Sequence, residues 1–119
     1  MFGFMRQSAP ALPLTEAISQ VASGEMILVD IRDHNELTQT GKADGALHIP
    51  LMRLSMVADP RHPDFHPDLD LTKPIGLYCA SGARSAMAVN VMRKLGYENV
   101  HNLGGLSHWV AAGGCCVPK

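Results

Sequence analysis

The stretch that decides the fold of this chain is residues 75–85, which read IGLYCASGARS. Residues 75–78 form a short apolar run, which is typical of a strand that is covered on both faces. This run leads into a loop of small and polar residues that begins at Cys79. Beyond the loop, apolar residues recur at helical spacing as far as Leu95, and Gly96 ends the pattern. The sequence therefore predicts a strand, a tight loop and a helix.

The same alternation continues on both sides of this unit. The other predicted strands are residues 26–30, 46–50 and 99–103, and the other predicted helices are residues 15–23, 51–57 and 106–112, with a further helix that begins at Asp33 and has Glu36 as its capping partner. Strands that alternate with helices indicate an α/β domain with a mostly parallel sheet. Ligands in such folds bind beyond the carboxyl ends of the strands, and Cys79 lies at such an end.

The bulk composition limits the possible classes of protein. The 119 residues suit one domain, which we place at residues 13–112, between a flexible leader over residues 1–12 and a flexible tail over residues 113–119. Ten Lys and Arg against eleven Asp and Glu give no basic excess for nucleic acid. No run reaches the roughly 18 apolar residues of a membrane span, and there is no secretory signal pattern. We therefore expect a cytoplasmic protein that binds neither nucleic acid nor membranes.

The loop after Cys79 has the residue types of an anion-binding cradle. Small side chains allow its backbone N–H groups to turn inward, and the start of the following helix favours negative charge. The same field, with the cation of Arg84, lowers the pKa of a thiol and populates the thiolate. Such a thiolate could accept a sulfane sulfur as a persulfide or attack the phosphorus of a phosphoester. A buried, inert cysteine is the simpler interpretation of position alone, but the loop and helix favour a nucleophile. The residues that we expect to bind substrate are Ala80, Ser81, Gly82, Ala83, Arg84 and Ser85.

Three stretches of the sequence together resemble the rhodanese family. They are residues 28–32 with the segment 41–50, residues 78–85, and residues 95–97 with the segment 103–109, so that the resemblance covers about residues 14–112. The resemblance implies a five-stranded, mostly parallel sheet flanked by helices. It also implies a protein that needs neither a metal nor an organic cofactor. Cys79 matches the nucleophile of the family, residues 80–85 match its anion-binding loop, and Asp30 and Arg32 match residues that support the site.

The function that the resemblance implies is that of a single-domain sulfurtransferase. Such an enzyme moves sulfane sulfur from thiosulfate or a persulfide donor to a thiol or cyanide acceptor through a Cys79 persulfide, and a protein partner in sulfur relay is a further prospect. Four residues separate Cys79 from Arg84, which resembles the sulfurtransferase loop, whereas phosphatase and arsenate-reductase relatives carry one residue more. Arg84 is the single cation of the loop, which puts a persulfide donor on an equal footing with thiosulfate. The alternatives are a sulfur carrier or regulatory module that turns over little by itself, and a phosphatase or arsenate reductase of the same fold.

For several side chains the sequence allows two different roles. Arg84 could bind a sulfonate oxygen or pair with Glu36. The adjacent Cys115 and Cys116 could resolve a persulfide on Cys79 or lie in an incidental tail. The loop at residues 58–74 carries His and Asp residues that could bind a metal, but its prolines favour a solvated loop. Trp109 is most simply a core anchor for the last helix.

Overall fold

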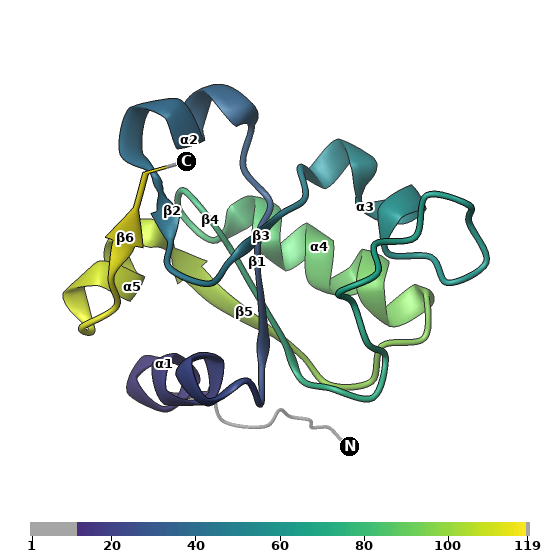
Figure 1. The fold of residues 1–119 in the computed structure, drawn as a ribbon, viewed down its shortest axis with the longest axis horizontal. Helices are drawn as coiled ribbons and strands as arrows, with labels where there is room; N and C mark the ends of the chain where they lie inside the picture. Colours follow the sequence, from purple (N-terminus) through teal and green to yellow (C-terminus); the bar gives the residue numbers. More distant parts are fainter. Residues whose placement is uncertain (1–11, 119) are drawn as a thin grey trace, which may run out of the picture.

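The computed structural model describes residues 12–118 of the chain (Figure 1). All but the last residue of the predicted leader lies outside the described residues. In chain order the elements are α1 (Leu14–Ser23), β1 (Ile27–Asp30), α2 (His34–Thr40), β2 (Lys42–Ala43), β3 (Leu47–His48), α3 (Leu51–Val57), β4 (Ile75–Cys79), α4 (Ala83–Lys94), β5 (Val100–Gly105), α5 (Leu106–Ala111) and β6 (Cys116–Val117). No helix among the described residues is both long and apolar enough to cross a membrane.

The central sheet is parallel and has the strand order β3-β1-β4-β5. This confirms the predicted α/β class with a parallel sheet. The sheet has four strands within residues 12–118, whereas the resemblance implied five. The remaining short strands, β2 and β6, pair with each other in a separate antiparallel sheet. The strand β4, which carries Cys79 at its end, lies between two neighbours and is buried along its whole length.

Helices cover both faces of the central sheet, and the strands divide their side chains between two cores. Val29 and Leu77 belong to a core with α3 and α4, whereas Leu28 and Tyr78 belong to a second core with α1 and α5. Successive residues of a strand point to opposite faces, so this division follows from the period of two. Figure 1 shows α1 and α5 on one side of the strands and α3 on the other. Trp109 is buried in the second core and anchors α5, as predicted.

The segment at residues 58–74 contains neither helix nor strand, which confirms the prediction of a long loop. The imidazoles of His62 and His66 accept hydrogen bonds from backbone N–H groups two residues further along, at 3.0 and 3.1 Å. These histidines therefore stabilise turns of the loop. Among residues 12–118, no three His, Cys, Asp or Glu side chains lie close enough together to hold a metal ion.

The segment that carries β6 lies beside β2 and the end of α2. Strand β6 pairs with β2, with Val117 opposite Lys42 and Cys116 opposite Ala43. Gly41 permits the close approach, because a Cβ at this position would lie 2.3 Å from the carbonyl oxygen of Val117. This pairing is not predictable from the sequence, since two residues are too few for a recognisable period.

Candidate functional site

Cys79 ends the buried strand β4 and is itself fully buried. The residues that follow, 80–85, turn back over the sulfur, and we call residues 79–85 the Cys79 loop. The N–H of Gly82 donates a hydrogen bond to Sγ at 2.9 Å, and the hydroxyl of Ser85 lies 3.5 Å from the same atom. Gly82 has a φ of 103°, a conformation that glycine adopts without strain and that closes the loop. The structure thus brings Cys79, Gly82 and Ser85 together.

The surroundings of the Cys79 sulfur make it a thiol that ionises near neutral pH. Burial by itself raises the pKa of this thiol. Hydrogen bonds from the Ser85 hydroxyl and from the backbone N–H groups of Ser85, Gly82 and Ser81 outweigh burial and lower the pKa to about 7. Donors that stabilise the charged form act in this direction. A large share of the protein therefore carries a thiolate at neutral pH.

The side chain of Asn102, on β5, fastens the Cys79 loop to the neighbouring strand. Its amide nitrogen donates to the carbonyl oxygen of Gly82 at 3.0 Å, and its amide oxygen accepts from the Ser85 hydroxyl at 2.6 Å and from the N–H of Gly104 at 2.9 Å. Sequence reasoning missed Asn102. A polar residue near the carboxyl end of a predicted strand, followed by two glycines, was the available signal.

At Gly105, strand β5 packs directly against the backbone of the Cys79 loop. A Cβ at Gly105 would lie 2.2 Å from the carbonyl oxygen of Ala80, so every side chain larger than that of glycine would displace the loop.

The remaining predicted substrate-binding residues differ in their exposure to solvent. Ala80, Ser81 and Ala83 are exposed, whereas Ser85 is fully buried and supports the loop from within.

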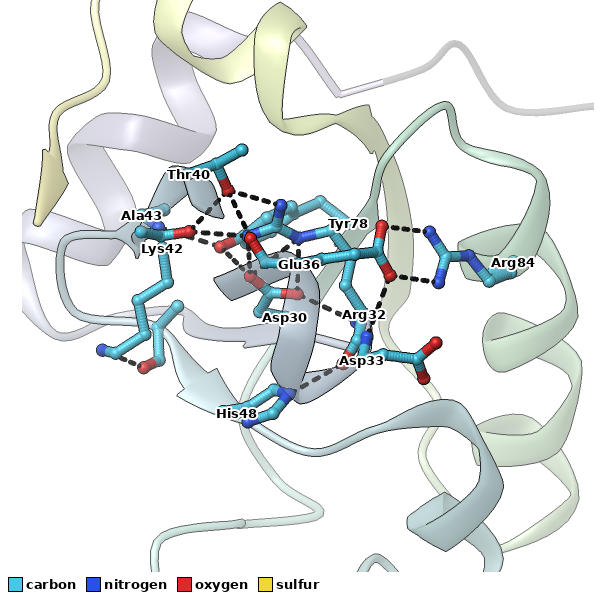
Figure 2. Close-up of polar contacts among 12 residues, drawn as sticks. Asp30, Arg32, Asp33, Glu36, Thr40, Lys42, Ala43, His48, Tyr78 and Arg84 are labelled. Atoms are coloured by element: carbon cyan, nitrogen blue, oxygen red, sulfur yellow. Dashed lines mark hydrogen bonds and ion pairs between the residues drawn. The ribbon is translucent and has the colours of Figure 1, made fainter. Parts of the chain in front are cut away.

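Arg84 is engaged in a two-pronged ion pair with Glu36 of α2 (Figure 2). The guanidinium nitrogens lie 2.7 and 2.8 Å from the two carboxylate oxygens. The pairing favours both charged forms, so it lowers the pKa of Glu36 to about 2 and raises that of Arg84. Glu36 also accepts the N–H of Asp33 at 3.0 Å, which is the predicted capping box. Of the two interpretations of Arg84, the structure shows the pairing with Glu36.

Asp30 and Arg32 form the centre of a buried polar network (Figure 2). The Arg32 Nε lies 3.0 Å from Oδ1 of Asp30, and its Nη2 lies 2.8 Å from Oδ2. Arg32 also donates to the Thr40 hydroxyl at 2.8 Å and to the carbonyl oxygen of Gly41 at 2.8 Å. The network therefore ties the end of β1 to the segment that follows α2.

Tyr78 connects this network to the nucleophile, because it directly precedes Cys79. Its hydroxyl donates to Asp30 at 2.6 Å and accepts the N–H of Ala43 at 2.9 Å. Burial and the bond to Asp30 both raise the pKa of this phenol, so it stays protonated and remains a donor. The sequence alone assigns no role to Tyr78. A tyrosine inside an apolar strand was the signal, because a buried hydroxyl requires a partner.

A cavity of about 550 Å³ opens beside the Cys79 loop. Ala80 of the loop forms part of its wall, together with Leu106, Val110 and Ala111 of α5 and Cys116 of β6. We call this space the α5 cavity. Its volume is in the range of small-molecule sites, and its walls are largely apolar.

The fold and the site together define a known class of α/β domain. The family model for the rhodanese-like domain matches residues 14–112 of the chain. The chain therefore belongs to the rhodanese-like domain family.

Relatives of known structure or name resemble this chain over most of its length. It is 31% identical over 103 residues to a human thiosulfate:glutathione sulfurtransferase, covering 82% of this chain and 89% of that protein. The structure of a human single-domain sulfurtransferase superimposes with a TM-score of 0.73 and 29% identity, covering 87% of this chain and 97% of the other. A protein of unknown function from Rhodopseudomonas palustris, described as a possible tyrosine phosphatase, has a TM-score of 0.79 and 34% identity, covering 90% and 83%.

Proposed function

We propose that this chain is a sulfurtransferase that carries sulfane sulfur as a persulfide on Cys79. The observation that carries the proposal is the closed Cys79 loop, in which backbone N–H groups and the Ser85 hydroxyl converge on one sulfur atom. The same donors can stabilise the anion of a persulfide, which is one atom longer than the thiolate. The sulfurtransferase relatives support the proposal at the level of the family.

The reaction divides into two transfers at the same sulfur atom. In the first, the Cys79 thiolate attacks the outer sulfur of the donor, and a new S–S bond forms as the donor's own bond to that sulfur breaks. Thiosulfate then leaves as sulfite, and a persulfide donor leaves as its thiolate. In the second, a thiolate or cyanide attacks the outer sulfur of the persulfide, and Cys79 is regenerated as the thiolate. The chemistry requires a free thiol at Cys79, which a reducing compartment such as the cytoplasm maintains.

The charges around the loop favour a persulfide over thiosulfate as the donor. Arg84 is paired with Glu36, and Arg32 is paired with Asp30. Each guanidinium is thus largely neutralised by a carboxylate before any substrate arrives. Both charges of thiosulfate lie on the small reacting group and gain little from cations that are already paired, whereas the reacting –S–S⁻ group of an organic persulfide carries a single charge. We expect a higher kcat/KM with glutathione persulfide than with thiosulfate.

A phosphatase is the second candidate, because one structural neighbour is described as a possible tyrosine phosphatase. The geometry argues against it. Only four residues separate Cys79 from Arg84, Sγ itself accepts the N–H of Gly82, and Arg84 is held by Glu36. A phosphoryl group has three oxygens that need donors. Turnover of an aryl phosphate above that of a Cys79→Ser variant would favour the phosphatase.

The decisive experiment detects sulfur on Cys79. The reduced protein is treated with thiosulfate or glutathione persulfide and digested without reductant. The mass of the peptide that contains Cys79 is then measured by mass spectrometry. A gain of one sulfur atom, lost again on treatment with cyanide and absent in Cys79→Ser, supports the persulfide mechanism. No gain with either donor would refute it. Loading without turnover to any thiol or cyanide would favour the carrier module over the enzyme.

A further inference from the structure

The adjacent cysteines near the end of the chain face two different cavities. Both are exposed and carry free thiols. Cys115 lines a cavity with Trp109 and Ile18 between α1 and the end of the chain. Cys116 lines the α5 cavity, whose wall includes Ala80 of the Cys79 loop. The opposite directions follow from the extended backbone, in which successive side chains alternate. Of this pair, Cys116 therefore shares a cavity with the Cys79 loop and Cys115 does not.

Specific backbone contacts set the direction in which Cys116 faces. The N–H of Asp44 donates to the carbonyl oxygen of Cys115 at 2.9 Å, and Cys116 is paired with Ala43 in the short antiparallel sheet. Gly114 packs against the indole of Trp109 so closely that a Cβ there would lie 2.2 Å from Nε1. Together these contacts hold Cys116 on the side of the α5 cavity.

We propose that Cys116 accepts the sulfane sulfur from the Cys79 persulfide and presents it at the surface of the protein. The inference rests on the proposed sulfurtransferase function. The Cys116 thiolate attacks the outer sulfur of the persulfide, and an S–S bond forms between that sulfur and Sγ of Cys116. The S–S bond at Cys79 breaks, and Cys79 leaves as the thiolate. One persulfide is consumed and one is formed, so the step needs no oxidant or reductant.

The environments of the two cysteines favour transfer in this direction. Cys79 is fully buried and its thiolate accepts several hydrogen bonds, so it is a good leaving group. Cys116 is exposed at the cavity, where an acceptor as large as another protein could approach it. A small acceptor such as cyanide could instead react at Cys79 directly. The relay therefore serves acceptors that cannot reach a buried sulfur.

The test locates the sulfur after loading and uses Cys115 as the matched control. Trypsin separates the sites, because peptide 62–84 contains Cys79 and peptide 95–119 contains both Cys115 and Cys116. After brief treatment with glutathione persulfide and removal of the donor, both peptides of the native protein should carry sulfur. Cys116→Ser should abolish the sulfur on peptide 95–119 and leave it on peptide 62–84. Cys115→Ser should behave like the native protein, and Cys79→Ser should leave peptide 95–119 without sulfur.

The outcomes separate the relay from the function on which it rests. Sulfur confined to peptide 62–84 in the native protein would overturn the relay and leave the sulfurtransferase proposal intact. Sulfur on peptide 95–119 of Cys79→Ser would mean direct loading, which also overturns the relay. Equal losses in Cys115→Ser and Cys116→Ser would overturn the assignment to Cys116. No sulfur on peptide 62–84 in any protein would refute the sulfurtransferase proposal itself. An intramolecular relay further requires that the fraction of sulfur on peptide 95–119 does not depend on protein concentration.

Discussion

Replacement of Ser85 by alanine tests whether hydrogen bonds within the Cys79 loop set the reactivity of the nucleophile. Burial raises the pKa of Cys79, and the Ser85 hydroxyl is the strongest of the groups that lower it. That hydroxyl lies 3.5 Å from Sγ and only 2.6 Å from the Asn102 amide oxygen, so it must turn away from Asn102 to serve the thiolate. Its contribution therefore belongs at the lower end of the range for charged hydrogen bonds, about 1.5 kcal/mol.

The energy converts directly into a shift of the titration curve. One pKa unit corresponds to about 1.4 kcal/mol, so Ser85→Ala should raise the pKa of Cys79 by about one unit. Well below the pKa, the thiolate fraction and the alkylation rate should then fall about tenfold. The rate of alkylation by iodoacetamide, followed on peptide 62–84 as a function of pH, measures this shift.

Ser81→Ala is the matched control for this substitution. Ser81 lies in the same loop but contributes its backbone N–H to the low pKa of Cys79, which alanine retains. We therefore expect Ser81→Ala to titrate like the native protein. A Ser85→Ala protein with native thermal stability and an unshifted alkylation profile would refute the argument that the Ser85 hydroxyl tunes the thiol.

Three further predictions concern the groups that hold the loop in place. Tyr78→Phe removes the hydroxyl that bonds Asp30 at 2.6 Å, so the free energy of unfolding in urea should fall by about 1–3 kcal/mol; an unchanged midpoint would contradict this. Gly105→Ala places a Cβ 2.2 Å from a carbonyl oxygen of the Cys79 loop, so sulfur loading should be lost even if the variant folds, and native loading would show that the contact is dispensable. Arg84 holds the pKa of Glu36 at about 2, below its ordinary 4.5, so the pair stabilises the fold above about pH 4.5 and loses this effect as the pH falls toward 2. Glu36→Gln should therefore flatten the decline in stability between about pH 4.5 and pH 2, and an equally steep decline would assign it to other groups.

The parts of the structure that the sequence predicted are those with local causes. The strand, loop and helix around Cys79 follow from apolar spacing and small residues within one short stretch, and the helix at Leu51–Val57 was predicted with its observed bounds. The capping box of Asp33 and Glu36 was predictable because its partners are three residues apart.

The parts that were missed depend on contacts between distant segments. The bond between Tyr78 and Asp30 spans 48 residues and requires β1 and β4 to be neighbours. The bonds of Asn102 to the Cys79 loop likewise require β5 to lie beside β4. No pattern within a single sequence fixes the order of strands in a sheet. The pairing of β6 with β2 was hidden for another reason, because strands of two residues leave no periodic trace.

The complete burial of Cys79 has a consequence for which reagents can reach its sulfur. A thiol that ionises near neutral pH is by its nature vulnerable to peroxides and to indiscriminate electrophiles. Here the chain covers that sulfur on every side, so entry is governed by size and shape and not by intrinsic nucleophilicity alone. Discrimination among reagents then depends on the residues that pack around the sulfur, and substitutions that loosen this packing would reduce it.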